Sequence, residues 1–391
     1  MLLTDQTRPT RAEISLSNLA NNLAIVKSQI QSDVKIMAMV KANAYGHGIE
    51  RIAKELVSLG VDALGVAYLE EAAFLRESGV KAPIVVLGAV NSWQIHSFLS
   101  YDVELCTSSI AKAQAISQAA KEKGCIAKIH LKIDTGMERI GVQWHNAPGF
   151  IDEVLKLSNL QIKGVFSHFA KAENDRDFTL TQLDRFQSVL KEVEKRGVKP
   201  EFIHLANSAA ILNYKESHFN MVRPGIMLYG YNPNGYLPET CFGGRFLLPV
   251  MTFKTKVSYF KVVQASTGIS YNHTFVTPQT TRMITLPVGY GDGYSRLLSN
   301  KADVILRGQR YPVAGNICMD QTMVDIGPQG TAYNGDDVLL FGQMDGMVLP
   351  LEELCQKIGT IPYEVLCLIS LRVPRIYIIP KESLHAAEAS M

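Results

Sequence analysis

Short apolar runs alternate with amphipathic stretches over the first part of the chain. The segments between the runs have the spacing of helices, and several of them end in glycine. Strands that alternate with helices form parallel sheets, and eight strand–helix units in this length are typical of a (β/α)8 barrel. The predicted strands are residues 34–41, 63–69, 84–90, 103–107, 127–134, 162–169, 202–206 and 221–229.

Beyond about residue 244 the pattern changes, because strand-like runs follow one another without long helical segments between them. Such a pattern is typical of a mostly antiparallel β domain. These strands are predicted at residues 251–264, 282–288, 303–306, 321–326 and 337–341. The fold class is therefore α/β plus β, with a TIM-like barrel at residues 12–244 and a β domain at residues 245–391, which residues 1–11 can join. A doubly wound open sheet is the alternative, although no G-x-G-x-x-G motif follows the first strand.

Composition narrows the classes of function. The 391 residues include 39 basic and 37 acidic side chains, so the net charge of +2 gives no large excess to hold a nucleic acid or a membrane surface. The six cysteines form no C-x-x-C pair and no metal-like cluster, which indicates buried reduced thiols and no metal site. The N-terminus lacks an apolar signal segment, and no stretch is long enough to span a membrane. We expect a soluble, cytoplasmic protein.

The first predicted strand ends in Lys41, which opens a loop of small residues. A lysine in apolar surroundings can lose its proton near neutral pH, and a neutral amine can form a Schiff base with an aldehyde. Taken alone, Lys41 is more simply explained as a cation that ends a strand. The other strand ends change this interpretation.

In a (β/α)8 barrel the chemistry lies at the C-terminal ends of the strands. Arg223 meets this condition only if the eighth strand stops near Pro224, earlier than its apolar run suggests. The segments after the seventh and eighth strands occupy positions where barrels bind phosphate through hydroxyls and backbone N–H groups. A phosphate site together with an amine nucleophile suggests pyridoxal phosphate. The polar strand-end residues are Lys41, Tyr45, Lys132, Arg139, His168, Asn207, Ser208 and Arg223, with Gly225 and Ile226 after the last strand.

With these residues in place, the chain resembles the alanine racemase family. The matching segments span nearly the whole chain in order, and as a set they are highly specific. They are M-V-K-A-N-A-Y-G-H-G at 39–48, D-T-G-M-E-R-I-G at 134–141, N-S at 207–208, V-R-P-G at 222–225, G-I-S-Y at 268–271, G-Y-G-D-G at 289–293, G-N-I-C-M-D at 315–320 and R-V-P-R at 372–375.

The resemblance implies a homodimer with shared active sites that interconverts L-alanine and D-alanine on pyridoxal 5'-phosphate and supplies D-alanine for peptidoglycan. Lys41 resembles the lysine that holds the cofactor, and Tyr271 resembles the opposing base, lent by the partner subunit. Arg139 and Met319 correspond to residues at the substrate carboxylate, and Lys132 matches a position that is carbamylated in some members. The other cofactor contacts implied are Tyr45, His168, Asn207, Ser208, Arg223, Gly225 and Ile226.

The physical chemistry of racemisation fits these roles. A proton must leave one face of a planar carbanion and another must arrive on the opposite face, so two bases are the simplest solution. Lysine and tyrosine have ordinary pKa values of about 10.4 and 10, so both must be lowered, and His168 and Arg223 are the expected causes for the tyrosine. A guanidinium keeps its protons, so Arg223 would leave the pyridine nitrogen unprotonated and the ring a weaker electron sink.

Two features leave questions open. Family members commonly carry a tyrosine before the R-V-P-R segment, and Leu371 stands there. This predicts a weaker hold on the cofactor phosphate, or looser selectivity for the substrate side chain, unless Tyr363 or water replaces the missing hydroxyl. Serine as well as alanine could enter a small pocket, since rejecting one hydroxyl contributes little selectivity.

A barrel-type amino-acid decarboxylase is the nearest alternative, although no C-E-S-G-D-like segment is present. A non-catalytic cofactor-binding barrel is the second, but it does not require Tyr271 or a second domain.

Overall fold

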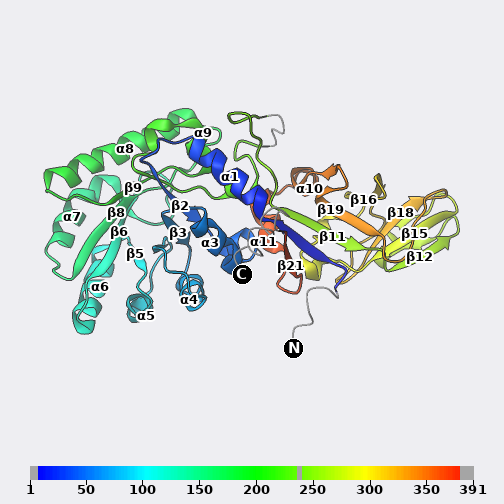
Figure 1. The fold of residues 1–391 in the computed structure, drawn as a ribbon, viewed down its shortest axis with the longest axis horizontal. Coiled ribbons are helices and arrows are strands. Elements are labelled where there is room, and N and C mark those ends of the chain that lie inside the picture. The colour runs from blue at the N-terminus through cyan, green and yellow to red at the C-terminus, as the bar shows by residue number, and fades with distance from the viewer. Residues whose placement is uncertain (1–7, 236–239, 379–391) are drawn as a thin grey trace, which may run out of the picture. The chain divides into compact units, whose positions relative to one another are not determined.

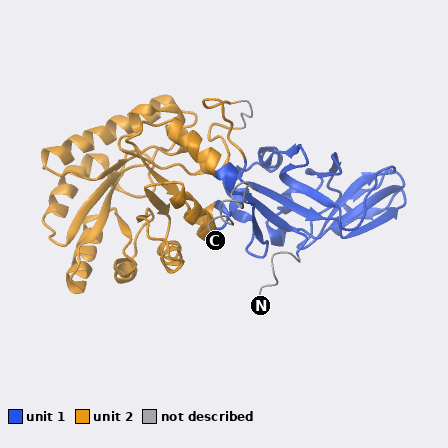
Figure 2. Cartoon of the chain, in the orientation of Figure 1, with its two compact units in different colours: residues 1–19, 45–48, 249–391 blue, residues 20–44, 49–248 orange. Residues whose placement is uncertain are grey.

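The computed structural model describes residues 8–235 and 240–378 (Figure 1). The chain divides into two compact units (Figure 2). One unit comprises residues 20–44 and 49–248, and the other comprises the described residues within 1–19, 45–48 and 249–391. Each unit has its own sheets and its own buried apolar core. The predicted division near residue 244 stays a prediction.

Eight parallel strands close into a barrel in the first unit (Figure 1). Their order is β5-β4-β3-β2-β10-β9-β8-β6, and pairing of β5 with β6 closes the ring. They are β2 (Lys35–Met39), β3 (Ala63–Val66), β4 (Ile84–Val86), β5 (Glu104–Thr107), β6 (Ala127–Asp134), β8 (Leu160–Phe166), β9 (Phe202–His204) and β10 (Met221–Val222), with β7 (Val142–Gln143) added beside β6. The predicted barrel and its eight strands are confirmed. Most of the strands are buried on both faces, which is why they appear in the sequence as continuous apolar runs.

Helices connect these strands, and local capping explains where two of them begin. Asp175 accepts a hydrogen bond from the Phe178 N–H at 3.0 Å at the start of α8, and Ser109 accepts one from Lys112 at the start of α6. Gly124 ends α6 with φ at 67°, a conformation that favours glycine. The helices are α1 (Leu16–Ser28), α3 (Ile49–Ser58), α4 (Leu69–Glu77), α5 (Ile95–Ser100), α6 (Ile110–Lys123), α7 (Ala147–Leu155), α8 (Arg176–Lys195) and α9 (Ser208–Asn213).

The eighth strand ends well before the predicted residue 229. β10 stops at Val222, and residues Ile226–Tyr229 form a buried 3-10 turn instead. Pro224 has no N–H to donate and restricts the residue before it, so the ladder cannot continue through it. The apolar run in the sequence extends past the end of the strand because the residues of this turn are also buried. The early stop places Arg223 at the strand end, as its predicted role requires.

The second unit is built from antiparallel sheets, as predicted, with one parallel pair between β1 and β21. A seven-stranded sheet contains β1 (Arg11–Ser15), β11 (Met251–Lys256), β16 (Asp303–Leu306), β17 (Gln309–Pro312), β19 (Asp337–Met344), β20 (Met347–Leu349) and β21 (Arg375–Ile378). A second sheet contains β12 (Tyr259–Val263), β15 (Thr281–Leu286) and β18 (Thr322–Gly327), and β13 (Gly268–Ile269) pairs with β14 (Phe275–Val276). Two short helices are α10 (Leu351–Ile358) and α11 (Pro362–Leu368).

Two predictions about this unit are corrected. The single strand predicted at residues 251–264 is two strands, β11 and β12, which belong to different sheets because the chain turns at residues 257–258. β1 lies in the seven-stranded sheet, although the predicted barrel domain starts at residue 12. Its partners are far away in the sequence, so local periodicity could not assign it. Across the described ranges, the structure contains no helix with the length and apolarity needed to cross a membrane.

Candidate active site

Basic side chains converge at the C-terminal ends of the barrel strands. The charges of Arg223, Lys132, Arg139 and Lys41 all act on His168, and together with burial they hold its pKa well below the ordinary histidine value. Burial is the largest cause, and Arg223 is the second. His168 is therefore a neutral imidazole beside a concentration of positive charge. This convergence is what the strand-end prediction required.

Lys41 follows β2 and begins a left-handed turn, α2 (Lys41–Tyr45). Ala42, Asn43 and Ala44 have φ between 52° and 55°, and Tyr45 continues with φ at 51°. Side chains rarely adopt this conformation, and each such residue costs roughly 1–2 kcal/mol. The sequence indicated only a loop of small residues here, so the turn is a new feature of the site.

Hydrogen bonds hold this turn. Ala44 N–H donates to the Val40 carbonyl at 2.8 Å, and Ile49 N–H donates to Asn43 Oδ1 at 2.9 Å. Ala42 N–H donates to Glu71 Oε1 at 2.5 Å. The other oxygen of Glu71 accepts from the Ala67 N–H at 2.7 Å, just after β3. Glu71 was not predicted as a site residue, since in sequence it is one of two glutamates at a helix start.

Arg223 is 4% exposed and is held by acceptors from several strands. Its Nη1 donates to His204 Nδ1 at 2.8 Å, and its Nη2 donates to the Ser167 carbonyl at 2.8 Å, the Leu205 carbonyl at 3.1 Å and His168 Nδ1 at 3.2 Å. Burial, and then the charge of Arg139, lowers the pKa of Arg223 to about 9. The guanidinium is therefore a fixed cation at neutral pH.

Lys132 is buried inside the barrel, with its Nζ 4.9 Å from the centre of the Phe166 ring. Burial, followed by the charge of Arg223, lowers the pKa of Lys132 to about 7. The neutral amine of Lys132 is therefore accessible at neutral pH. A neutral amine is the form that can react with carbon dioxide, but the carbamylation of Lys132 stays a prediction.

The segments after β9 and β10 meet at Ser208. Its Oγ accepts from the Gly225 N–H at 2.9 Å and from the Met227 N–H at 3.4 Å. Asn207 caps α9, since its Oδ1 accepts from the Ala210 N–H at 3.0 Å, and in this way it fixes Ser208 at the first position of the helix. Ile226 is buried directly after Gly225. The structure brings these predicted residues together and adds Met227.

The exposed Arg139 lies in a turn anchored by Asp134 at the end of β6. The Asp134 carboxylate accepts the N–H groups of the three residues that precede Arg139 by one to three positions, at 2.8, 3.0 and 3.2 Å. Below this turn, Gln182 on α8 donates to the Thr135 hydroxyl at 3.2 Å and to the His168 carbonyl at 3.1 Å. Gln182 and Thr135 were missed in the sequence because nothing in their surroundings distinguishes them from ordinary core contacts.

In the second unit, Tyr271 and Met319 lie on segments that hydrogen bonds join. Asn316 Nδ2 donates to the Tyr271 carbonyl at 2.7 Å, and Ser270 Oγ donates to the Asn316 carbonyl at 2.6 Å. The Tyr271 and Met319 side chains are 69% and 53% exposed. The segments that carry the two predicted residues are therefore joined, and both side chains are exposed, although 47 intervening residues separate them in the sequence.

The Met319 segment is held by residues of the G-Y-G-D-G and R-V-P-R segments. Its carbonyl accepts from the Gly291 N–H at 2.9 Å and from Arg372 Nη2 at 3.2 Å. Arg372 also pairs with the fully buried Asp292 and with Asp320, both at 2.8 Å. A Cβ at position 291 would lie 2.4 Å from Arg372 Nη2, so the absence of a side chain there permits the close approach.

Tyr45 is 6% exposed, and its ring centre lies 6.0 Å from that of Tyr363. Burial raises the pKa of Tyr45 far above the ordinary tyrosine value, with smaller contributions from Tyr363 and Cys367, so the phenol stays protonated and able to donate. Leu371 is 85% exposed. The tyrosine beside Tyr45 is therefore Tyr363, whereas position 371 holds an exposed leucine.

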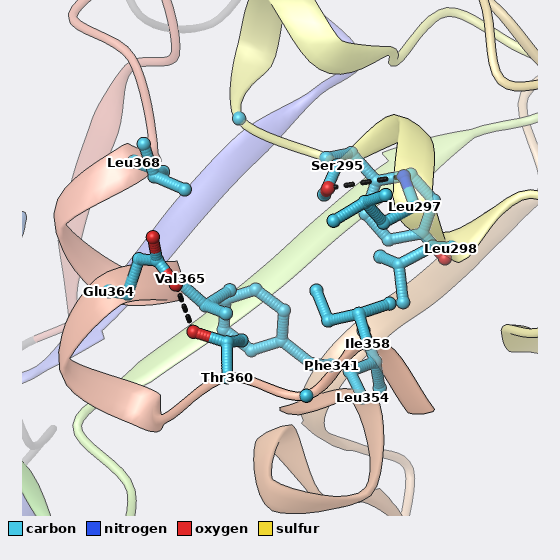
Figure 3. Close-up of a pocket in the computed structure, with 13 residues that line it drawn as sticks. Ser295, Leu297, Leu298, Phe341, Leu354, Ile358, Thr360, Glu364, Val365 and Leu368 are labelled. Carbon is cyan, nitrogen blue, oxygen red and sulfur yellow. Dashed lines mark hydrogen bonds between the residues drawn. The ribbon is translucent and has the colours of Figure 1, made fainter. Parts of the chain in front are cut away.

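A pocket of about 320 Å³ lies in the second unit (Figure 3). Its lining is mostly apolar, and its polar side chains include Ser295, Thr360 and Glu364, of which Thr360 donates to Glu364. None of the predicted site residues lines this pocket. The basic strand ends of the barrel, and not this pocket, are the better candidate for chemistry.

A closed parallel barrel with an amine at its mouth, continued by an antiparallel β unit, defines a two-part barrel enzyme. Sequence comparison makes the class specific. The profile "Alanine racemase, N-terminal domain" matches residues 14–233, and "Alanine racemase, C-terminal domain" matches residues 250–377. The chain belongs to the alanine racemase family.

Individual relatives agree along nearly the whole chain. "Alanine racemase 2" of Caldanaerobacter subterraneus subsp. tengcongensis is 43% identical over 96% of this chain and 96% of its own length. The solved alanine racemase of Clostridium difficile 630 superposes with a TM-score of 0.90 at 37% identity, covering 95% of this chain and 96% of its own. The Bacillus anthracis structure, "with bound L-Ala-P", gives a TM-score of 0.89 at 35% identity over 95% and 96% of the two chains. These matches favour the racemase over the decarboxylase alternative.

Proposed function

We propose that the protein interconverts L-alanine and D-alanine with pyridoxal 5'-phosphate as its cofactor. The observation that carries the proposal is Lys41, held by a strained turn at the mouth of a barrel whose strand ends gather Arg223, Lys132, Arg139 and His168. Full-length similarity to alanine racemases supports the choice of substrate. The supply of D-alanine for peptidoglycan and a cytoplasmic location stay predictions from the resemblance.

The residues present fit this cofactor. The N–H groups of Gly225 and Met227 donate to Ser208 Oγ and so position its hydroxyl, whose own O–H can donate to a phosphate. Tyr45, which the resemblance assigns to the cofactor, has a buried phenol that stays protonated, with Tyr363 beside it. Asn207 and Ile226 hold this segment in place, and Lys41 supplies the amine for covalent attachment. When bound, pyridoxal phosphate supplies an electron sink for the charge left on the substrate α-carbon.

Arg223 is suited to the pyridine nitrogen because a guanidinium donates hydrogen bonds and does not release its proton at neutral pH. It would therefore leave that nitrogen unprotonated, which limits how long negative charge persists and restricts side reactions. The four acceptors that surround Arg223 fix its direction. We propose that His168 stays uncharged here and separates the Arg223 charge from the reacting groups.

Two bases on opposite faces would move the protons. We propose that Lys41 Nζ takes or returns a proton on one face and that Tyr271 Oη serves the other, lent by a second copy of the chain. The exposure of Tyr271 within its own unit supports such a loan. Because hydrogen bonds join the Tyr271 and Met319 segments, the copy that lends Tyr271 also brings Met319. The Met319 N–H and the exposed Arg139 would then bind the substrate carboxylate.

Deuterium incorporation tests this arrangement. Wild-type protein with L-alanine in heavy water is expected to form both enantiomers with deuterium at the α-carbon and to release no carbon dioxide. Tyr271→Phe is expected to slow racemisation by about 10²–10⁴-fold, since one general base is lost. Deuterium should then enter only the enantiomer whose α-hydrogen faces Lys41.

A matched control is Tyr259→Phe, which changes another exposed tyrosine of the same unit and should retain full activity. Undiminished racemisation by Tyr271→Phe, or carbon dioxide release by the wild type, would overturn the proposal. Sedimentation of the wild type tests the second copy, since a monomer with full activity is incompatible with a borrowed base.

A further inference from the structure

A continuous line of hydrogen bonds runs from Arg223 into the interior of the barrel. Arg223 Nη1 lies 2.8 Å from His204 Nδ1, His204 Nε2 lies 2.9 Å from His130 Nδ1, and His130 Nε2 lies 2.6 Å from Glu104 Oε2. Both histidines are fully buried, and Glu104 is 6% exposed. The line joins β10, β9, β6 and β5 through side chains that the proposed mechanism does not use.

The guanidinium at one end fixes the direction of every bond. Arginine offers only donors, so His204 Nδ1 must accept, and its proton must be on Nε2. That Nε2–H donates to His130, whose Nδ1 must accept in turn, and so His130 also carries its proton on Nε2. The last bond therefore runs from His130 to the Glu104 carboxylate. A proton on Nδ1 of His204 would face the Arg223 donor, and a proton on Nδ1 of His130 would face the His204 Nε2–H donor.

The barrel is shaped around these two rings. His130 pairs in register with Gly164, and a Cβ at position 164 would lie 2.2 Å from His130 Nδ1. The Phe202 ring stacks on His130 with its centre 6.1 Å away and an interplanar angle of 9°. The Phe166 ring stacks on His204 at 4.8 Å and 3°. The rings cannot turn freely, so both the tautomers and the orientations are fixed.

The line also joins opposite charges across the barrel. Arg223 is a buried cation near Lys132 and Arg139, and Glu104 is a buried carboxylate at the other end. Charged groups at both ends polarise the neutral rings between them and strengthen each hydrogen bond. Arg76, which donates to four backbone carbonyls nearby, is a further charge that acts on Glu104.

We propose that Glu104 and His130 are positioning residues, which lock His204 as an acceptor and thereby hold Arg223 in the orientation that catalysis requires. The line itself is a property of the folded chain. Its effect on catalysis rests on the proposed racemase function, because only there does Arg223 have a catalytic role.

Nuclear magnetic resonance of the cofactor-free protein, with ¹⁵N-labelled histidine, tests the line directly. Variants His130→Asn and His204→Asn assign the signals. The wild type is expected to show both rings neutral with the proton on Nε2, and the His130 Nε2–H proton should be shifted far downfield by the short bond. Glu104→Gln should keep this pattern, since its amide oxygen still accepts, whereas Glu104→Leu should lose the downfield proton. A protonated Nδ1 on His204 in the wild type overturns the proposal.

Kinetics of the holoenzyme test the consequence. Glu104→Leu is expected to lower kcat by roughly tenfold or more, as loss of an outer partner does elsewhere, with little change in KM. Glu104→Gln should restore most of that loss. Glu77→Leu removes an exposed glutamate of the same unit that accepts from the Tyr101 hydroxyl at 2.7 Å, and it should leave kcat unchanged. Wild-type kcat in Glu104→Leu overturns the positioning role.

Gly164→Ala provides a second route if Glu104→Leu does not fold. It changes no charge, but its Cβ must displace the His130 ring, so it should lower kcat and alter the histidine signals as Glu104→Leu does. Unchanged signals in this variant count against the line. If the wild type does not racemise alanine, the proposed function fails while the resonance pattern still decides whether the line exists.

Discussion

Replacing Glu71 should disturb the active site from outside it. Its carboxylate accepts from the N–H groups of Ala42 at 2.5 Å, Ala67 at 2.7 Å and Tyr68 at 3.3 Å. One side chain on α4 therefore ties the turn after Lys41 to the end of β3. We predict that Glu71→Leu releases this turn and misplaces the Lys41 amine.

The magnitude follows from the strain that the turn stores. Four left-handed residues, 42–45, cost roughly 1–2 kcal/mol each, or about 4–8 kcal/mol together. The two shorter hydrogen bonds to Glu71, from Ala42 and Ala67, contribute about 1.5–3 kcal/mol each, or about 3–6 kcal/mol together. Because water can replace part of the bond to the exposed Ala42 N–H, we expect a loss of about 2–4 kcal/mol in unfolding free energy. A displacement of about 1 Å at Lys41 would lower kcat by roughly 100-fold.

The assay compares urea unfolding of the cofactor-free protein with steady-state racemisation. Glu70→Leu, at the exposed neighbouring position on α4, is the matched control and should change neither quantity. Ala42→Gly removes the strain at one residue, so in that background Glu71→Leu should cost about 1 kcal/mol less, which a double-mutant cycle measures. Equal behaviour of Glu71→Leu and Glu70→Leu, or a cycle without coupling, would refute the reasoning.

Three further variants test other parts of the site. Arg372→Leu loosens the Met319 segment by about 1 kcal/mol, so KM for alanine should rise roughly fivefold. Because L-alanine and D-alanine have equal free energies, kcat/KM should fall equally for both enantiomers. Unequal falls contradict this prediction. In carbon dioxide-free buffer, Lys132→Met should raise the unfolding free energy by a few kcal/mol at pH 7 and little at pH 10. The wild-type pKa falls from 10.5 to about 7 on folding, so the folded state binds fewer protons in that window and its stability rises with pH. An equal gain at both values refutes it. Tyr363→Phe should speed cofactor dissociation about tenfold or more. Leu371→Tyr, at an exposed position, should leave the dissociation rate unchanged. If instead Leu371→Tyr slows dissociation and Tyr363→Phe has no effect, residue 371 is the missing contact.

The barrel could be predicted because its signal is local. A strand buried on both faces is a short apolar run, and eight such runs with helices between them allow few folds. Boundaries failed where burial and secondary structure diverge, as at the buried turn Ile226–Tyr229, which the sequence extended as strand. β1 failed for the opposite reason, because its pattern is compatible with a strand but its partners β11 and β21 lie hundreds of residues away.

The site divides in the same way. Lys41 and Arg223 could be found because the barrel fixes where strand ends lie and because their chemistry is distinctive. Glu71 and Gln182 could not, since each acts on a backbone group of a residue that only the fold brings near. Glu104 carried a weak signal, a carboxylate inside an apolar strand, but its partner His130 is on another strand.

The electrostatics explain why such supporting residues are needed. Four basic side chains converge at one site of a protein whose net charge is only +2. The repulsion among them is therefore concentrated at this site and must be opposed there. Burial and mutual repulsion lower the pKa values of Lys132 and Arg223, so the fold holds these charges at a cost. A phosphate and a carboxylate supply the opposite charge, so binding of both anions relieves the repulsion that the fold maintains. Under the proposed function, the same cations that destabilise the barrel mouth would favour an anionic cofactor and an amino-acid substrate.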